Sequence, residues 1–267
     1  MAEPFLVSPG SRVNLAEHDP DYTGEYKSKK QAAKDLDDYR DRLRELQEVL
    51  WAEDRHALLI VLQAMDAGGK DGAIEHVFHG VNPQGCHVTS FKVPTSEERA
   101  HDFLWRVHRA VPGRGEIGIF NRSHYEDVLV VRVDNLAPEA VWRQRYDQIN
   151  HFEKLLADTG TTILKFYLHI SKDEQKERFQ ARLDDPHKNW KFSMGDVEKR
   201  AQWDDYMAAF EEALSRCSTP WAPWYVIPAN HKWYRNLALS RIIVETLEAL
   251  DMHYPPPLAD AGSIVIP

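Results

Sequence analysis

The sequence predicts an α/β fold in which helices cover both faces of a five-stranded parallel sheet. Short apolar runs alternate with longer segments of helical periodicity, and this alternation is typical of strands joined by helical crossovers. Because such crossovers are right-handed and return the chain to the same end of the sheet, we expect parallel strands. The chain has 267 residues, 43% of them hydrophobic, which suits one domain of this kind.

The predicted domain extends over residues 28–254. Residues 1–27 are rich in Pro, Gly and Asp and form an N-terminal arm that we expect to lie along the surface. Residues 255–267 form a C-terminal tail. The apolar side chains expected to anchor the arm are Phe5, Leu6, Val13 and Leu15.

A long amphipathic helix is predicted from Ser28 to Arg55. Ser28 and Gln31 have the spacing of a capping box, and apolar residues then recur at helical intervals. The helix either packs on the domain or pairs with a second copy of the chain. Its apolar face is predicted to consist of Ala33, Leu36, Tyr39, Leu43, Leu46 and Leu50.

The stretch 57–81 predicts a strand, a loop of phosphate-binding size and a helix. An apolar run at 58–62 precedes a turn that contains Asp66, Gly68, Gly69 and Lys70. Glycines let backbone amides approach a ligand closely, a helix N-terminus adds partial positive charge, and a lysine adds a full charge. We therefore expect phosphate binding, with an ordinary turn and a solvated lysine as the alternative.

This loop matches the pattern G-x-x-x-x-G-K-[ST] incompletely. Ala64 replaces the first glycine, and Asp71 replaces the hydroxyl residue that would bind Mg²⁺. An acid within a phosphate-binding loop would repel the ligand unless a cation lay between them. Asp66 is therefore predicted to act with a metal ion.

The next elements lead to a polar cluster at the end of a strand. A second strand is predicted over 86–93, a helix over 97–110 capped by Thr95 or Ser96, and a third strand over 116–120. Residues 121–127 (NRSHYED) follow that strand directly, and open α/β sheets bind ligands at the carboxyl ends of their strands. Asp66, Glu126 and Asp127 are thus candidate Mg²⁺ ligands, directly or through water, or else surface carboxylates with local hydrogen bonds.

The second half of the chain alternates in the same way. Ser171 and Glu174 have capping-box spacing, which predicts a helix over 171–183, and Pro138 is predicted at the first position of an earlier helix. The remaining predicted elements are a helix over 138–158, a strand over 161–170, a mobile loop over 184–195, a helix over 196–217, a strand over 224–227 and a helix over 233–250.

Basic residues gather around the loop that follows the fourth strand. Such residues are either solvated or part of a lid that closes over phosphates and expels water. Arginine favours the second interpretation because its guanidinium binds phosphate oxygens in a bidentate manner. The basic set is Arg122, Arg178, Arg182, Lys188, Lys191 and Arg200.

Composition excludes several classes of protein. The net charge of −9 argues against a general nucleic-acid binder, so a polyanionic ligand would need a local basic groove. Cys86 and Cys217 form no metal-binding pattern and suit a reducing cytoplasm. Because no apolar stretch approaches about 18 residues and no signal peptide is recognisable, we expect a cytoplasmic protein without a membrane segment.

With these motifs assembled, the chain resembles family-2 polyphosphate kinases, from about Ser28 to Tyr254. The resemblance rests on LQAMDAGGKDG at 62–72, FNRSHYEDV at 120–128, the stretch 171–196 and APWYVIPANHKWYRN at 222–236. It implies a thymidylate-kinase-like P-loop kinase fold with a helical lid at about 171–206. It also implies Mg²⁺-dependent phosphoryl transfer, with Mn²⁺ as a possible substitute, between inorganic polyphosphate and AMP, ADP or ATP. We expect a homo-oligomer, either a dimer or a tetramer.

The resemblance also implies residue roles. Catalytic roles fall on Asp66, Lys70, Arg122, Asp127 and Arg182. Nucleotide and phosphate contacts fall on Ala67, Gly68, Gly69, Lys70, Asp71, Gly72, Asn121, Glu126, Arg178, Lys188 and Lys191, and metal binding falls on Asp66, Glu126 and Asp127.

One departure points to a subclass. Many members read D-R-S-W-Y-N-R at the second motif, whereas this chain has Asn121, Glu126 and Asp127 in place of the first aspartate, the asparagine and the second arginine. This pattern resembles the class III members, which accept both AMP and ADP. The alternatives are an ATP-dependent nucleoside monophosphate kinase and a non-catalytic nucleotide-binding regulator.

Overall fold

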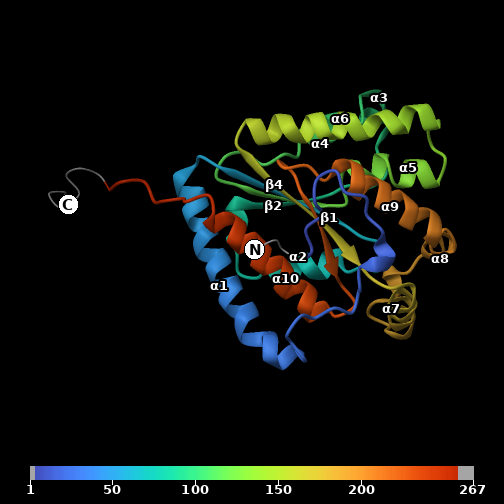
Figure 1. Ribbon diagram of the computed structural model, residues 1–267, viewed down its shortest axis with the longest axis horizontal. Helices are drawn as coiled ribbons and strands as arrows, with labels where there is room; N and C mark the ends of the chain where they lie inside the picture. The colour runs from blue at the N-terminus through green and yellow to red at the C-terminus, as the bar shows by residue number, and fades with distance from the viewer. Residues whose placement is uncertain (1–3, 258–267) are drawn as a thin grey trace.

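The computed structural model describes residues 4–257 and has three layers, with a parallel sheet between two layers of helices (Figure 1). The five strands lie in the order β2-β3-β1-β4-β5 and all pairs are parallel, as predicted. The strands are β1 (Ala57–Gln63), β2 (Cys86–Ser90), β3 (Ile117–Asn121), β4 (Thr161–His169) and β5 (Trp224–Pro228).

Strand β1 occupies the centre of the sheet. It pairs with β3 on one side, where Leu58 lies opposite Ile117, and with β4 on the other. All seven of its residues are buried, which explains why the strand is a continuous apolar run rather than an alternating one. The loops that follow β1 and β3 are therefore neighbours at one end of the sheet.

One face of the sheet is covered by α1 (Lys29–Glu53), α2 (Lys70–Val77) and α10 (Lys232–Glu248), and the other by α6 (Glu139–Asp158) and α9 (Trp203–Cys217) (Figure 1). Helix α1 packs along α10, so the interpretation that it packs on the domain is confirmed. Ala32, not Ala33, belongs to its buried face. Pro138 is the N-cap of α6 rather than its first residue.

The cap of α1 also differs from the prediction. Ser28 accepts the amide of Gln31 as expected, but the Gln31 side chain accepts the amide of Lys27 instead of that of Ser28. The two capping bonds therefore enclose one residue more than a capping box does.

Two predicted elements near the sheet edge are wrong in extent. The strand predicted over 86–93 ends at Ser90, because its partner β3 ends at Asn121, whose carbonyl accepts the amide of Phe91 as the last bond of the pair. The helix predicted over 97–110 is two short helices, α3 (Ser96–Ala100) and α4 (Trp105–His108). Asp102 accepts the amide of Leu104, and this local turn interrupts the helix. The predicted cap at Thr95 is confirmed.

The helix predicted over 196–217 is also two helices. α8 (Met194–Ala201) begins two residues early, with a capping box between Ser193 and Asp196, and α9 follows after Gln202. The Gln202 amide turns back to the carbonyl of Lys199, which closes α8 with a tighter turn. The preceding segment contains α7 (Lys172–Asp184), capped by Ser171 as predicted, and a 3₁₀ turn, η4 (Asn189–Lys191).

The N-terminal arm was expected to lie along the surface, and it also pairs with strand β5. Leu6 bridges Tyr225 in an antiparallel sense, the Val7 amide donates to Trp224 and the Val226 amide donates to Phe5. The arm thereby occupies the exposed edge of β5, where unpaired strand groups would otherwise remain. Phe5, Val13 and Leu15 are buried as predicted, Leu6 is half-buried, and Val7 is an additional buried anchor.

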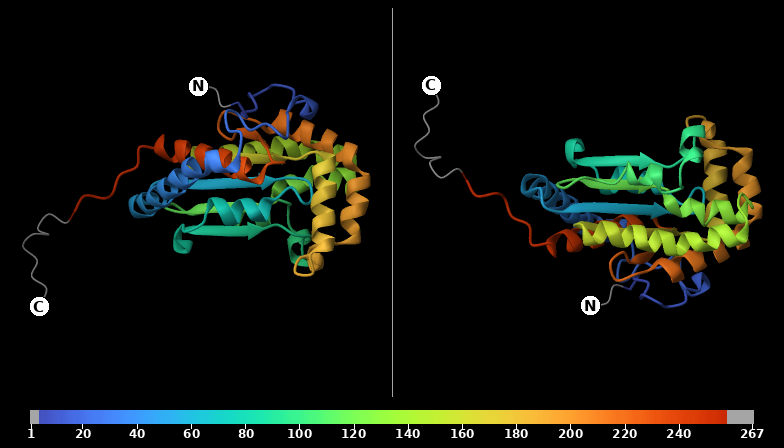
Figure 2. Two further views of the ribbon diagram at one scale, coloured as in Figure 1. Left: turned by 90° about the horizontal axis from the view of Figure 1, so that it is seen from below. Right: turned by 90° about the horizontal axis from the view of Figure 1, so that it is seen from above.

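Within residues 4–257, no helix combines the length and the apolar character needed to cross a membrane. Most of the predicted C-terminal tail lies outside the described residues. The strands all point toward the end of the molecule where α7, α8 and α9 stand (Figure 2). The predicted site residues occupy this end of the sheet.

Candidate active site

The loop between β1 and α2 has the backbone of an anion-binding turn. Ala67 and Gly69 both have left-handed backbone angles, with φ of 60° and 95°. A side chain at Gly68 would place its Cβ 2.5 Å from that of Ala64, so only glycine fits there. The first amides of α2 have no partner within the helix and are available to a ligand. We refer to residues 64–69 together with Lys70 as the phosphate loop.

Lys70 is the first residue of α2 and is buried, so the alternative of a solvated lysine is wrong. Its Nζ donates to the carbonyl oxygen of Ala64 at 3.1 Å. Burial lowers its pKa, and the charge of Arg122 lowers it further, while Asp66 opposes the change. A phosphate anion would relieve this unfavourable setting of the cation.

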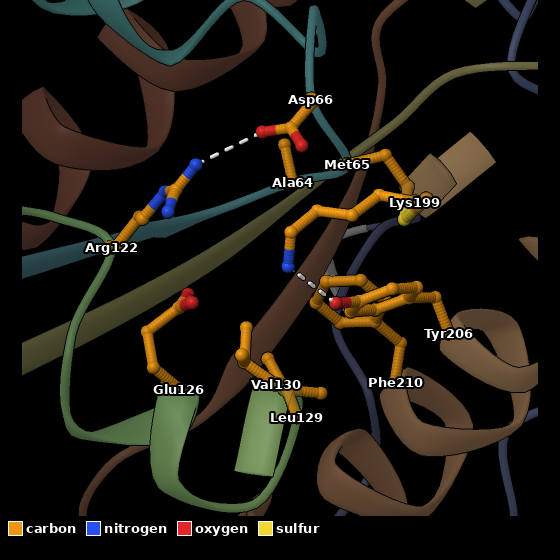
Figure 3. Close-up of a pocket in the computed structure, with 10 residues that line it drawn as sticks. All are labelled: Ala64, Met65, Asp66, Arg122, Glu126, Leu129, Val130, Lys199, Tyr206 and Phe210. Atoms are coloured by element: carbon orange, nitrogen blue, oxygen red, sulfur yellow. Dashed lines mark hydrogen bonds and ion pairs between the residues drawn. The ribbon is translucent and has the colours of Figure 1, made fainter. Parts of the chain in front are cut away.

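Asp66 and Arg122 join the phosphate loop to the end of β3. The Arg122 guanidinium donates to Asp66 at 2.9 Å, and both side chains line a pocket (Figure 3). Arg122 has a φ of 60°, a backbone angle that is uncommon and strained for a residue with a side chain. Its amide donates to Leu62 of β1, which holds the backbone in this position.

Glu126 and Asp127 are adjacent in the 3₁₀ turn η3 (His124–Asp127), yet they have different surroundings. Glu126 lines the pocket and accepts a hydrogen bond from Gln63 at 3.1 Å. Asp127 pairs with Arg145 of α6 at 2.8 Å, and Arg145 also donates to its backbone carbonyl. Burial raises the pKa of Asp127, and Arg145 opposes that change.

The three carboxylates predicted as metal ligands do not form one cluster. Within residues 4–257, no group of three or more His, Cys, Asp or Glu side chains is placed to hold a metal ion. Asp66 and Glu126 both line the pocket, whereas Asp127 is not among its lining residues. Two carboxylates still suit Mg²⁺, which commonly binds one or two of them together with substrate phosphates.

The far side of the pocket is formed by α8 and α9, and its residues were not among the predicted site residues. Lys199 of α8 and Tyr206 and Phe210 of α9 face Asp66, Arg122 and Glu126 (Figure 3). Lys199 donates to the Tyr206 hydroxyl at 2.9 Å; burial opposes its charge, but this bond raises its pKa. Tyr206 and Phe210 are four residues apart, a spacing that by itself indicates only a packed helix face. Leu129 and Val130 complete the apolar wall, and Val130 begins an unpredicted short helix, α5 (Val130–Val133).

Several predicted ligand-binding residues contact the protein itself. Asn121 donates to Asp71 at 2.7 Å, which links β3 to α2 beside the phosphate loop. Arg178 is buried and donates to backbone carbonyls, including that of Ala67 at 3.0 Å, rather than facing the pocket. Gly72 lies within the first turn of α2, near Arg235.

The remaining predicted cations lie farther along the chain. Arg182 is half-buried over the ring of Phe179, Lys188 pairs with Asp185 at 2.7 Å, and Lys191 lies over the ring of Trp190. None of these three cations lines the pocket described above. Lys188 and Lys191 are exposed.

The comparison with known families decides the assignment. Residues 26–255 match the family model described as polyphosphate kinase 2. The chain belongs to the polyphosphate kinase 2 family. The fold agrees with a solved family structure, polyphosphate kinase 2 from Arthrobacter aurescens TC1, at a TM-score of 0.94 and 47% identity over 98% of this chain and 94% of that one.

Two curated relatives cover nearly the whole chain. The AMP/ADP-polyphosphate phosphotransferase of Meiothermus ruber is 59% identical over 98% of both chains. The ADP-polyphosphate phosphotransferase of Rhodopseudomonas palustris is 49% identical over 94% of this chain and 91% of its own. The family resemblance noted in the sequence motifs is thus confirmed.

Proposed function

We propose that this polyphosphate kinase 2 family member transfers a phosphoryl group from inorganic polyphosphate to AMP and to ADP, and that it also catalyses the reverse reaction. The observation that carries the proposal is the buried Lys70 in a left-handed loop next to the Asp66–Arg122 pair. The relative from Meiothermus ruber, named for both AMP and ADP, supports the choice of acceptors.

Transfer of a phosphoryl group asks mainly for positioning and for compensation of negative charge. The amides at the start of α2 and the Lys70 ammonium bind phosphate oxygens near the transferred group. Arg122 and Arg182 neutralise charge that develops on that group. Lys199, Tyr206 and Phe210 close the opposite wall and exclude water from the pocket.

Asp66 and Glu126 are the residues that would hold Mg²⁺, or Mn²⁺ in its place, because both carboxylates line the pocket. When bound, the ion would supply positive charge that offsets the negative charge of the phosphates. Asp127 does not line the pocket. Its carboxylate and its backbone carbonyl both bind Arg145, and these contacts hold the end of η3 in place. We also propose a cytoplasmic dimer or tetramer that binds neither nucleic acid nor membranes.

A donor exchange tests the reaction. The enzyme is incubated with Mg²⁺ and either AMP or ADP, using polyphosphate or ATP as the donor, and the nucleotides are separated by chromatography. We expect polyphosphate to convert AMP to ADP and ADP to ATP. Formation of ADP from AMP with ATP alone would instead indicate a nucleoside monophosphate kinase, and nucleotide binding without turnover would indicate a regulator.

Lys70→Met tests whether the phosphate loop carries this reaction. The substitution approximately keeps side-chain length but removes the charge, so we expect turnover to fall at least ~100-fold with an unchanged circular dichroism spectrum. Lys34→Met, at an exposed position of α1, is the matched control and should retain full activity. Activity of Lys70→Met within a few-fold of the parent would place the phosphate site elsewhere.

A further inference from the structure

Side chains from distant helices hold the backbone carbonyls of the phosphate loop. The carbonyl oxygen of Asp66 accepts from Gln175 at 2.9 Å, that of Ala67 accepts from Arg178 at 3.0 Å, and that of Gly69 accepts from Arg235 at 2.9 Å. Gln175 and Arg178 belong to α7, and Arg235 belongs to α10. We call Gln175, Arg178 and Arg235 the carbonyl clamp.

The clamp side chains are buried and have further partners that fix their direction. Their exposed fractions are 1% for Gln175, 8% for Arg178 and 2% for Arg235. Arg178 also donates to the carbonyl oxygens of Ala229 and Asn230 and pairs with Glu174. Such buried polar groups are costly unless they are fully bonded, so these contacts constrain both the side chains and the loop.

Gln175 and Arg235 are held from a second side as well. The Gln175 side-chain oxygen accepts from Arg200 of α8 at 3.1 Å, and Arg235 donates twice to Asn236. Burial, with a smaller effect of Arg178, lowers the pKa of Arg235 to about 10, so this guanidinium stays protonated at neutral pH. The clamp therefore adds positive charge beneath a loop that binds anions.

Holding the carbonyls also orients the amides. In a planar trans peptide the C=O of one residue and the N–H of the next point in opposite directions. The bonds to the Asp66 and Gly69 oxygens thus direct the amides of Ala67 and Lys70 away from the clamp. A Cβ added at Gly69 would lie 2.1 Å from the nearest Arg235 nitrogen, so the guanidinium contacts the loop backbone directly.

We propose that Gln175, Arg178 and Arg235 are positioning residues that hold the phosphate loop in its ligand-binding conformation. The catalytic consequence rests on the proposed function, because it assumes that the loop binds the phosphates that are transferred. Loss of the bond from Gln175 or Arg178 removes the side-chain donor from the Asp66 or Ala67 carbonyl. Loss of the bond from Arg235 leaves the Gly69 carbonyl with the amide of Ala73 alone. Either loss lets the peptide units of the loop reorient. Because the loop would bind phosphates in the reactions of both AMP and ADP, kcat should fall by the same factor with either acceptor.

The test uses two clamp variants with different chemistry and one control. Gln175→Met removes the donor to Asp66 and keeps the side-chain length, and Arg235→Lys keeps the charge but loses the planar fork. Arg40→Lys is the control, because Arg40 is a largely buried arginine of α1 with an ion pair to Asp37. For each protein we measure melting temperature, kcat and KM with AMP and ADP, and hydrogen exchange of peptides that cover residues 64–73.

We expect kcat of both clamp variants to fall by about 10-fold to 100-fold with either acceptor, at an unchanged ratio of AMP to ADP activity. Exchange in residues 64–73 should accelerate at least about 10-fold while peptides from β4 exchange as in the parent. The control should match the parent. A lower melting temperature with unchanged loop exchange, or with unchanged kcat, would overturn the proposal.

The exchange measurement separates this proposal from the proposed function. If the parent enzyme transfers no phosphoryl group from polyphosphate, the proposed function fails, and loop exchange still tests the clamp. If the parent is active and the clamp variants keep both parent exchange and parent kcat, the clamp fails alone.

Discussion

At the scale of single residues, Glu126 and Asp127 show how adjacent acids acquire different tasks. The Glu126 carboxylate lies in the pocket and, within residues 4–257, accepts one hydrogen bond, from the side-chain amide of Gln63, so it has capacity to bind a cation. The Asp127 carboxylate is half-buried and paired with Arg145, so its negative charge is already compensated. Of these two acids, we therefore propose that Glu126 acts directly on a bound nucleotide or metal ion.

We predict that Glu126→Asn depresses phosphorylation of AMP more than that of ADP. The attacking oxygen belongs to the α-phosphate in AMP and to the β-phosphate in ADP, so the shorter acceptor depends more on where the pocket places charge. A misplacement of about 1 Å can cost about 100-fold in rate. The measurement is kcat/KM for both acceptors at saturating Mg²⁺, and an unchanged AMP-to-ADP ratio would contradict the expected role.

Asp127→Asn is the matched comparison for Glu126→Asn. It weakens the contact with Arg145 that fixes η3, so both activities should fall together. A selective loss of AMP activity in Asp127→Asn would mean that the two acids have exchanged the expected roles.

The site residues that lie in one short motif could be predicted from the sequence. Those that bind a loop distant in the sequence could not. Lys70 and Asp66 lie in one recognisable loop, and Arg122 follows a buried strand. Gln175 and Arg235 are 109 and 166 residues away from the loop carbonyls that they bind. A glutamine or arginine on an amphipathic helix normally indicates a solvated face, and only the packing of α7 and α10 reveals the contact.

At the scale of elements, the prediction succeeded where periodicity and caps agreed. Helices α1 and α7 begin after Ser28 and Ser171 as expected, and strand β1 is a continuous buried run. The prediction was wrong where a single side chain or a neighbouring strand determines where an element ends or which segment pairs with it. Asp102 accepts the amide of Leu104 between α3 and α4, and the N-terminal arm pairs with the edge of β5. Such choices depend on contacts between distant segments, which periodicity does not report.

The segment from α7 to η4 contains exposed lysines whose contacts with polyphosphate should depend on salt concentration. Gln175 and Arg178 tie the first half of α7 to the phosphate loop, whereas Lys188 and Lys191 beyond it are exposed. Exposed contacts with a polyanion are screened over about 8 Å at physiological ionic strength. We therefore expect the KM for polyphosphate to rise with KCl concentration.

Single substitutions divide this segment further. Lys188→Ala and Lys191→Ala should mainly raise the KM for polyphosphate, and Arg182→Ala should lower kcat. Lys30→Ala, an exposed lysine of α1, is the control and should keep the salt dependence of the parent. A KM for polyphosphate that does not change with KCl would argue against a basic path along the lid.

At the scale of the whole molecule, an acidic protein places three buried cations around one loop, while a fourth, Lys165, is paired with Glu153 inside the core. The net charge is −9, yet Lys70, Arg178 and Arg235 are buried around the phosphate loop. Like charges at close range disfavour the folded state unless carboxylates, carbonyls or a ligand offset them. We infer that a bound polyanion stabilises the fold.

The end of the sheet that carries the phosphate loop also contains a buried histidine that should make stability depend on pH. His169 ends β4 and is 7% exposed, and burial, with a smaller effect of nearby His18, lowers its pKa to about 4. In the unfolded chain this pKa is about 6.5, so between the two values the unfolded state binds more protons and stability falls as pH is lowered. Between about pH 7 and about pH 5 the expected loss is about 2 kcal/mol.

His169→Gln cannot titrate, so its free energy of unfolding, measured with urea at both pH values, should fall by less than that of the parent. The exposed His253→Gln should behave like the parent, and equal losses in all three proteins would show that His169 does not set the acid sensitivity.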